Sequence, residues 1–351
     1  MNIARRLMEG GHYHGPLSMS GNPVAALHRL LRDQFQLRTH HSVQKKPTGF
    51  ALPERARRLG LGTVQFAQRY GISNRRGQVP ADEVRAILAC AAGAGLGLLD
   101  TAANYGEAEA VLSEMDTSGF RLVSKTASIA LGVDAVVARV RQSARALGRL
   151  DLLLVHSAGD LLGPQGERLW RALGALKLEG VTAGIGISAY VDDNPAWLAE
   201  RFRPDAMQVP CSILDQRLLR DGSLERLKQL GVEVHARSVF LQGLLFLESF
   251  PERLQYAQSA LESARARIAA AGTTPLAAAL AFVLSRPEVD VAVVGVAALK
   301  HLQEILAAVC EPVPELDWET CALDDARILT PSLWDLGPAT PPHVRQWRAT
   351  R

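Results

Sequence analysis

The sequence predicts an α/β protein built around a (β/α)8 TIM barrel, with an N-terminal extension before the barrel and a proline-rich C-terminal tail after it. From residue 58 onward, short hydrophobic runs alternate with longer segments of helical periodicity, which is the order typical of a parallel sheet. Eight such units follow one another, whereas an open doubly wound sheet usually has about five or six strands. The 351 residues suffice for one barrel of about 250 residues with two appendages.

The predicted strands are short runs rich in leucine and valine. We expect them at residues 58–63, 96–100, 120–124, 150–155, 181–187, 205–209, 231–236 and 289–294. The predicted helices lie between them, at residues 82–94, 106–115, 133–147, 165–179, 193–200, 222–230, 252–271 with 275–285, and 299–309. Gly95 and Gly180 follow two of these helices and are typical stop signals.

The glycines do not form a dinucleotide-binding loop of the Rossmann type. Gly93, Gly95 and Gly97 follow a predicted helix and precede a predicted strand, which is the opposite of the strand, loop and helix order of that fingerprint. Gly184 and Gly186 lack a third glycine before a helix. These patterns also favour the barrel over an open sheet.

We predict three parts: an extension over residues 1–55, the barrel over 56–310 and a tail over 311–351. The extension has one helical pattern near residues 25–35, few acids, and five of the nine histidines, namely His12, His14, His28, His40 and His41. No carboxylate or thiol spacing supports a metal site among them, so a flexible tail is the favoured interpretation. The basic, acid-poor composition of the extension also resembles an organelle transit peptide.

The C-terminal tail contains six prolines and cannot be regular throughout. The sequence leaves open whether it wraps the barrel, reaches over the barrel mouth or is partly disordered. In the first two cases Trp318, Trp334 and Trp347 are the expected anchors.

Composition narrows the class of protein. The net charge of +3 is small and the basic residues are dispersed, which argues against nucleic acid as the main partner. The four cysteines form no Cys-x-x-Cys pair and suit a reducing compartment. The longest apolar stretches are shorter than the roughly 20 residues of a membrane span, and the start lacks the apolar core of a secretory signal. We therefore expect a cytoplasmic protein without a membrane partner, whose oligomeric state the sequence does not reveal.

Four ionisable residues stand where predicted strands end. Asp100, Lys125 and His156 directly follow the second, third and fourth hydrophobic runs, and Tyr105 lies in the loop just past Asp100. In a closed parallel barrel the carboxyl ends of all strands surround one cavity, so these side chains can meet at a single reacting atom. Taken singly, each residue has an ordinary explanation. Asp100 can cap a helix and Tyr105 can be a packing residue, while Lys125 can be solvated and His156 can be bonded to the backbone. Their shared position favours catalysis.

The chemistry of the four groups suits a carbonyl. A buried lysine beside a carboxylate stays charged and favours ionisation of a nearby phenol. With Lys125 and Asp100 behind it, Tyr105 can give a proton to a carbonyl oxygen, which His156 orients as a second donor. No pattern indicates a metal or flavin site, so a nicotinamide is the natural source of hydride.

The segment Asp100-Thr101-Ala102-Ala103-Asn104-Tyr105-Gly106-Glu107-Ala108-Glu109 resembles the signature of the aldo-keto reductases. The resemblance extends over about residues 56–310 and includes the exits of the first, third and fourth strands. It implies that Tyr105 is the general acid, that Asp100 and Lys125 tune it, and that His156 orients the carbonyl. It also implies a cofactor, NADP(H) or alternatively NAD(H), that lies extended across the barrel mouth. The start Gly-Thr-Val-Gln-Phe resembles bacterial members associated with polysaccharide or secondary metabolism.

The same resemblance implies the cofactor-binding residues, which are Gly62, Thr63, Ser188, Gln208, Arg237, Ser238, Gly295 and Glu304. Ser188 and Gln208 resemble the residues that hold the nicotinamide carboxamide. Four positions depart from the family pattern: Ala189 replaces an asparagine, Arg237 an aromatic residue, Ala297 an arginine and Ile305 an asparagine. The last two weaken the expected site for the 2′-phosphate, which puts a preference for NADPH in doubt.

Three functions remain open at this point. The first is an NAD(P)H-dependent oxidoreductase that interconverts a carbonyl and an alcohol on a small polar or sugar-like substrate. The second is a non-redox binding or scaffold protein whose cofactor cleft has decayed. The third is a redox-neutral isomerase or lyase that uses Tyr105 and Lys125. The sequence does not reveal the substrate or the direction of the reaction.

Overall fold

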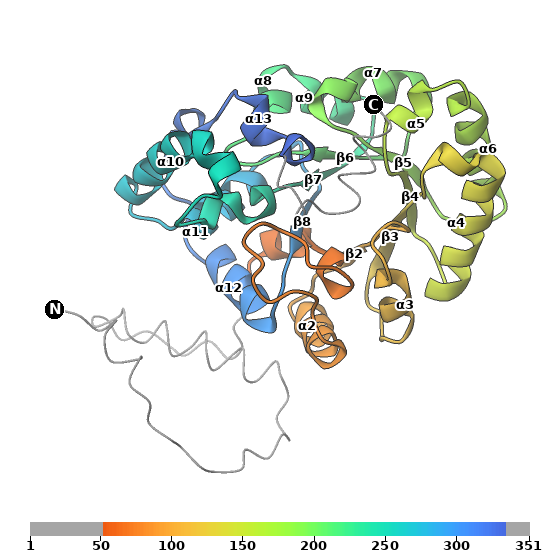
Figure 1. Ribbon diagram of the computed structural model, residues 1–351, viewed down its shortest axis with the longest axis horizontal. Coiled ribbons are helices and arrows are strands. Elements are labelled where there is room, and N and C mark those ends of the chain that lie inside the picture. The colour runs from red at the N-terminus through yellow and green to blue at the C-terminus, as the bar shows by residue number, and fades with distance from the viewer. Residues whose placement is uncertain (1–51, 335–351) are drawn as a thin grey trace, which may run out of the picture. The chain divides into compact units, whose positions relative to one another are not determined.

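A computed structural model of the chain describes residues 52–334. Eight parallel strands follow one another around a closed barrel in chain order, and helices surround them (Figure 1). The strands are β1 (Leu59–Gly62), β2 (Leu98–Asp100), β3 (Arg121–Lys125), β4 (Leu152–Val155), β5 (Ile185–Ser188), β6 (Ala206–Pro210), β7 (Glu233–Arg237) and β8 (Val291–Gly295). The predicted fold class and all eight predicted strands are thus confirmed.

The helices occupy the predicted segments. The main ones are α2 (Ala81–Gly93), α3 (Ala108–Ser113), α4 (Val133–Leu147), α6 (Gly166–Leu178), α7 (Pro195–Phe202), α9 (Ser223–Gln229), α10 (Gln258–Ala270), α11 (Pro275–Leu284) and α12 (Leu299–Val309). Three short helices, which the sequence analysis did not predict, lie in loops or beyond the barrel: α5 (Gly159–Leu162), α8 (Arg217–Arg220) and α13 (Ala326–Leu329).

Two boundaries differ from the prediction by more than two residues. β5 begins at Ile185 instead of residue 181, where the Asp205 carboxylate accepts a hydrogen bond from the Ile185 amide at 2.8 Å. The helix predicted from residue 252 begins with a 3-10 turn, Glu252–Ala257, and becomes α-helical only at Gln258.

The register of the strands brings the site to one end of the barrel. Asp100 of β2 lies opposite Gly62 of β1 on one side and Val123 of β3 on the other. Gly62 also pairs with Gly295 of β8. Since paired residues of neighbouring strands point to the same side, the side chains at these strand ends face a common space.

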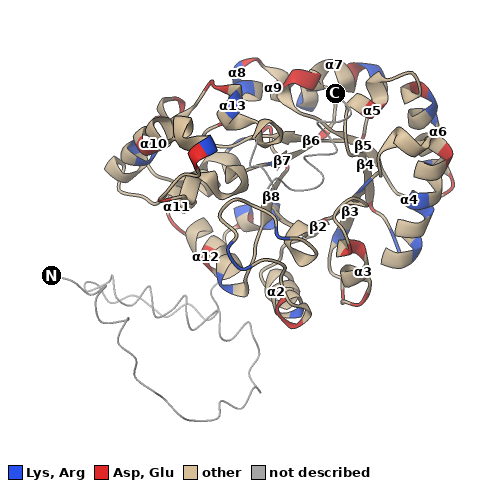
Figure 2. Ribbon diagram, in the orientation of Figure 1, with Lys and Arg blue, Asp and Glu red and all other residues tan. Residues whose placement is uncertain are grey.

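An apolar cluster lies among the strands of the barrel, and most charges lie on the surrounding helices (Figure 2). The core cluster includes Leu98, Val123 and Leu154. At the opposite end of the strands, Arg121 binds Glu233 through both nitrogens, at 2.8 and 3.0 Å. These residues begin β3 and β7, which lie on opposite sides of the ring.

The described part of the tail packs on the outside of the barrel. The Gln216 amide donates a hydrogen bond to the Trp318 carbonyl at 2.7 Å, and the Leu323 amide donates one to the Leu214 carbonyl at 2.8 Å. Trp334 is only 2% exposed. Of the three predicted tryptophan anchors, Trp318 therefore contacts the barrel and Trp334 is buried. Trp347 lies outside the described residues.

Several predictions concern parts of the chain that are not described. The helical pattern near residues 25–35 and all five histidines of the extension belong to this part. The division into 1–55, 56–310 and 311–351 stays a prediction. Within residues 52–334 no single helix is long and apolar enough to cross a membrane, and one bent pair, Glu252–Ala270 with Pro275–Leu284, meets that test by length and composition only.

Candidate active site

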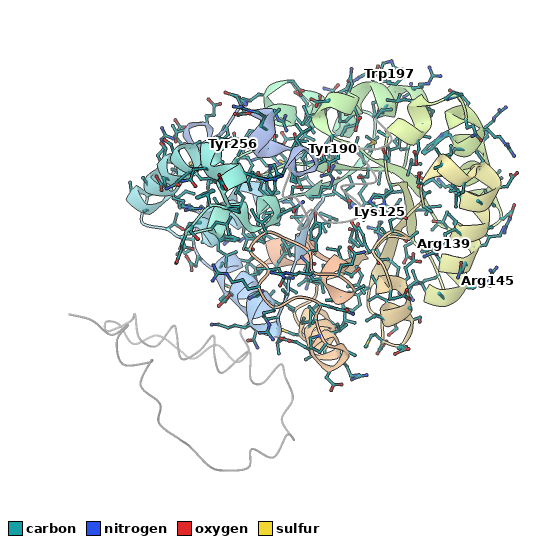
Figure 3. The ribbon with its side chains drawn as sticks, viewed as in Figure 1. Lys125, Arg139, Arg145, Tyr190, Trp197 and Tyr256 are labelled. Carbon is teal, nitrogen blue, oxygen red and sulfur yellow. The ribbon has the colours of Figure 1, made fainter. Side chains whose placement is uncertain are left out.

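A buried ion pair joins the ends of β2 and β3. The Nζ atom of Lys125 donates a hydrogen bond to Oδ2 of Asp100 at 2.6 Å, and the two side chains are 1% and 5% exposed. The same amine donates to the Thr101 carbonyl at 2.9 Å. The Gln208 amide donates to Oδ1 of Asp100 at 2.7 Å, so both carboxylate oxygens are satisfied. Lys125 lies inside the ring of strands (Figure 3).

Tyr105 is held above this pair by the loop after β2. The Tyr105 amide donates to the Ala102 carbonyl at 3.0 Å, and the Tyr105 carbonyl accepts from Ala108 at 3.1 Å, at the start of α3. Gly106 allows the intervening turn because its φ is +56°. As a result the Lys125 amine lies 3.4 Å from the phenolic oxygen and 4.9 Å from the ring centroid of Tyr105.

His156 completes the predicted quartet. Its ring meets that of Tyr105 edge to face, with centroids 5.7 Å apart and planes at 82°. The His156 backbone amide donates to the Thr126 hydroxyl at 3.2 Å, which ties the end of β4 to the end of β3. The structure therefore brings together all four residues that the sequence analysis predicted.

Burial governs the protonation of the phenol. It raises the pKa of Tyr105 well above its usual value, the charge of Asp100 adds to that rise, and Arg237 opposes it. The expectation that Lys125 favours ionisation of the phenol is therefore outweighed in this structure. Burial also lowers the pKa of Lys125, against the effect of Asp100. Tyr105 is thus a protonated phenol near neutral pH, as a proton donor must be.

A cavity of about 480 Å³ opens beside Asp100 and Tyr105. Its size falls in the range of small-molecule and cofactor sites. It is bounded by the ends of β1, β7 and β8, by the loops that follow them and by the first turns of α12, and it includes Val64, Gln65, Tyr70, Asn74, Val239, Phe240, Gln242, Phe246, Ala297, His301 and Ile305.

Most predicted cofactor-binding residues line this cavity. They are Gly62, Thr63, Gln208, Arg237, Ser238, Gly295 and Glu304. Ser188 does not line it, although it is buried and pairs with Gln208 in the sheet. The Gln208 amide nitrogen is engaged with Asp100, so Gln208 also supports the ion pair, a contact that the sequence analysis missed.

Arg237 occupies the position where the family pattern has an aromatic ring. Its guanidinium stacks over the Tyr190 ring at 4.1 Å from the centroid and donates to the Ala189 carbonyl at 3.1 Å. Within residues 52–334 no carboxylate lies within ion-pair distance of it. A planar cation without a paired acid therefore faces the cavity, next to Ser238, whose φ is +61°.

The sequence analysis missed two residues of the loop after β1. Tyr70 lines the cavity, and burial of its hydroxyl raises its pKa, with further contributions from Tyr105 and Tyr190. Gln65 also lines the cavity, and its Oε1 atom is buried without a hydrogen-bond partner in the described chain. Both residues lie in the loop after β1. The rule that polar residues at or just past the end of a strand mark the site, which identified Asp100, Lys125 and His156, therefore applies to this loop as well.

A metal centre finds no support in residues 52–334, where no group of three or more His, Cys, Asp or Glu residues is arranged to hold an ion. The four cysteines are free thiols, and burial raises the pKa of each of them. They lie outside the cavity lining.

The model of the aldo/keto reductase family matches residues 58–323. Among solved structures, an aldo-keto reductase from Bacillus halodurans, AKR11C1 in its holo form, is 22% identical, with a TM-score of 0.60 over 73% of this chain and 87% of that one. A putative aldo-keto reductase from Pseudomonas aeruginosa is 24% identical, with a TM-score of 0.53 over 72% and 89% of the two chains. The similarity to these two structures shows the fold of the chain. No curated protein matches the sequence.

Proposed function

This chain belongs to the aldo/keto reductase family, and from that membership we propose that it is an NAD(P)H-dependent oxidoreductase that interconverts a carbonyl and an alcohol. The observation that carries the proposal is the approach of a buried ammonium to a protonated phenol, 3.4 Å apart at the barrel mouth. This arrangement donates a proton to an oxygen on which negative charge develops.

Each of the four residues has a role in this reaction. Tyr105 donates its phenolic proton to the carbonyl oxygen, and Lys125 then stabilises the phenolate across 3.4 Å. Asp100 keeps the Lys125 ammonium charged in its buried position. His156 approaches Tyr105 from the side and orients the same oxygen. When bound, a reduced nicotinamide supplies the hydride for the carbonyl carbon.

The cavity lining fits such a cofactor. Gln65 offers a buried carbonyl oxygen without a partner in the described chain, which suits an N–H or O–H donor of a ligand. Arg237 and Ser238 supply a cation and a hydroxyl, the donors that a pyrophosphate requires. Gly62 and Gly295 present backbone to the same cavity. We propose that these residues, with Thr63, Gln208 and Glu304, hold the cofactor; Ser188 stays a prediction of the sequence alone.

The substrate that we propose is small and polar or sugar-like. The Asn74 side-chain amide lines the cavity but is bonded to backbone groups of Arg76 and Gly77. The loop after β1 also brings the hydroxyls of Tyr70 and Ser73 to the cavity. These groups hydrogen-bond a hydroxylated substrate better than they pack against a large apolar one.

Cofactor binding separates this function from its alternatives. Titration of the purified protein with NADH and NADPH, followed by fluorescence quenching and by the shift in melting temperature, should show binding of at least one of them. If neither cofactor changes either signal at millimolar concentration, the non-redox scaffold is favoured, an alternative suggested by Ala189 and Ala297. Turnover of a substrate to an isomer or elimination product without added cofactor would instead favour the redox-neutral reaction.

A further inference from the structure

The cavity has two chemically different ends. Asp100 at the end of β2 and Tyr105 in the loop after it lie at one end. Ala297, His301, Glu304 and Ile305 lie at the other end, in the loop after β8 and in α12. The proposed function requires the nicotinamide to lie beside Tyr105. The adenosine of an extended dinucleotide must then lie at the α12 end.

The first turn of α12 is already capped by groups of the protein itself. The Glu83 carboxylate accepts a hydrogen bond from the Leu299 amide at 3.0 Å. The His301 ring accepts one from the Ala297 amide at 3.3 Å through Nδ1. Backbone amides at a helix N-terminus are the usual ligands of a phosphate, and here two of them are engaged.

The charges at this end are also unfavourable for a phosphate. Glu83 comes from α2 and has a side chain 22% exposed, and Glu304 lines the cavity itself. Arg76 binds the Glu83 carboxylate at 2.9 Å, and Lys300 binds the Glu304 carboxylate at 3.6 Å. A phosphate placed there would meet the Glu304 carboxylate directly, and the Glu83 carboxylate would lie next to it at the first residue of α12.

NADH and NADPH differ at this end alone. NADPH carries a 2′-phosphate with about two negative charges, whereas NADH carries a ribose diol, which donates hydrogen bonds that a carboxylate accepts. We infer that this chain selects NADH over NADPH because the Glu304 carboxylate lines the α12 end of the cavity and the Glu83 carboxylate is bonded to the first residue of α12. This inference rests on the proposed function and names the cofactor that the same site takes.

The test measures dissociation constants for NADH and NADPH by fluorescence quenching, in the natural protein and in Glu83→Gln. Glutamine retains an oxygen for the Leu299 amide and removes the charge. Glu200→Gln is the matched control, since Glu200 also binds an arginine, Arg226 at 2.7 Å, but on α7 and α9. Glu304→Gln provides a second test if Glu83→Gln does not fold.

We expect the natural protein to bind NADH about tenfold or more tightly than NADPH. Glu83→Gln should reduce this ratio severalfold, chiefly by tightening NADPH, and Glu200→Gln should leave it unchanged. Equal or tighter binding of NADPH by the natural protein overturns the inference and leaves the proposed function intact. If the preference for NADH is the same in Glu83→Gln and in Glu304→Gln, the two carboxylates are not its cause. If neither cofactor binds, the proposed function itself is wrong.

Discussion

The ammonium of Lys125 and the carboxylate of Asp100 lie 2.6 Å apart although they belong to different strands. Asp100 pairs with Val123 in the sheet, and Lys125 is two residues further along β3. Residues two apart in a strand point to the same face, so the register turns both side chains into the barrel. The ion pair is therefore a consequence of the β2 and β3 alignment, and Tyr105 is brought to it by the loop between them.

Replacement of Tyr105 by phenylalanine tests the proton donor. The ring and its packing against His156 remain, but the hydroxyl is lost, so we expect turnover to fall by about 10²- to 10⁴-fold. The dissociation constant for the cofactor should stay nearly unchanged, because the phenol does not hold the cofactor. Steady-state kinetics together with cofactor titration measure both quantities. A variant with full turnover would show that another group donates the proton.

Replacement of Lys125 by methionine tests whether the ion pair serves both folding and catalysis. The variant leaves the Asp100 carboxylate buried with only Gln208 as a side-chain partner. We expect the free energy of unfolding to fall by about 3–5 kcal/mol, because an uncompensated buried charge remains. Turnover should also be lost. Urea unfolding and kinetics measure the two effects.

The double variant Asp100→Asn with Lys125→Met is the control. It removes both charges, so much of the lost stability should return while turnover stays absent. Recovery of turnover along with stability would mean that the pair has only a structural role.

The raised pKa of Tyr105 makes a prediction about pH. An exposed tyrosine loses its proton near pH 10, whereas burial keeps the Tyr105 phenol protonated to higher pH. Carbonyl reduction should therefore show no decline due to Tyr105 between about pH 7 and 10. Alcohol oxidation needs the phenolate as a base, so its rate should rise over the same range. Values of kcat/KM in both directions test this; a reduction rate that falls with an apparent pKa near 7 would indicate a different acid.

The lowered pKa of Glu233, at the other end of the barrel, predicts that the stability of the protein depends on pH. Hydrogen bonds from His235 and then Arg121 lower its pKa, against the effect of burial. A carboxyl whose folded-state pKa is depressed stabilises the fold above its unfolded pKa of about 4.3, and this contribution is lost as the pH falls through the folded-state value.

We therefore expect Glu233→Gln to lower the free energy of unfolding by about 1–3 kcal/mol at neutral pH. The difference from the natural protein should narrow below about pH 4. Glu167→Gln, which removes an exposed pair with Arg201, should cost less than about 1 kcal/mol. Urea unfolding across the pH range measures these differences, and a gap for Glu233→Gln that does not change with pH would contradict the account.

The sequence could predict the barrel and the four residues of the candidate site because both depend on local patterns. Hydrophobic runs mark the strands, and polar residues at their ends mark the site; Asp100, Lys125 and His156 needed only this rule. Tyr105 needed the motif around it. The same rule extends to Tyr70 and Gln65 beyond β1, so these were within reach of the sequence.

Other features depend on contacts between distant segments and leave no pattern in the chain. The Gln208 amide reaches Asp100 across 108 positions of sequence, and Glu83 reaches Leu299 across 216. The effect of burial on the pKa of Tyr105 likewise depends on segments distant in sequence, which no local spacing specifies. Sequence reasoning identified the four residues that meet at the candidate site but not the groups that support them.

The most direct test of the account follows deuterium from the nicotinamide C4 of deuterated NADH or NADPH into product alcohol, with a panel of small polar aldehydes and ketones. The natural protein should transfer one deuterium to the former carbonyl carbon of at least one substrate, and Tyr105→Phe should transfer it at a small fraction of that rate. Absence of deuterium from every product, or equal rates for the two proteins, would contradict the assignment of Tyr105 and Lys125 to carbonyl reduction.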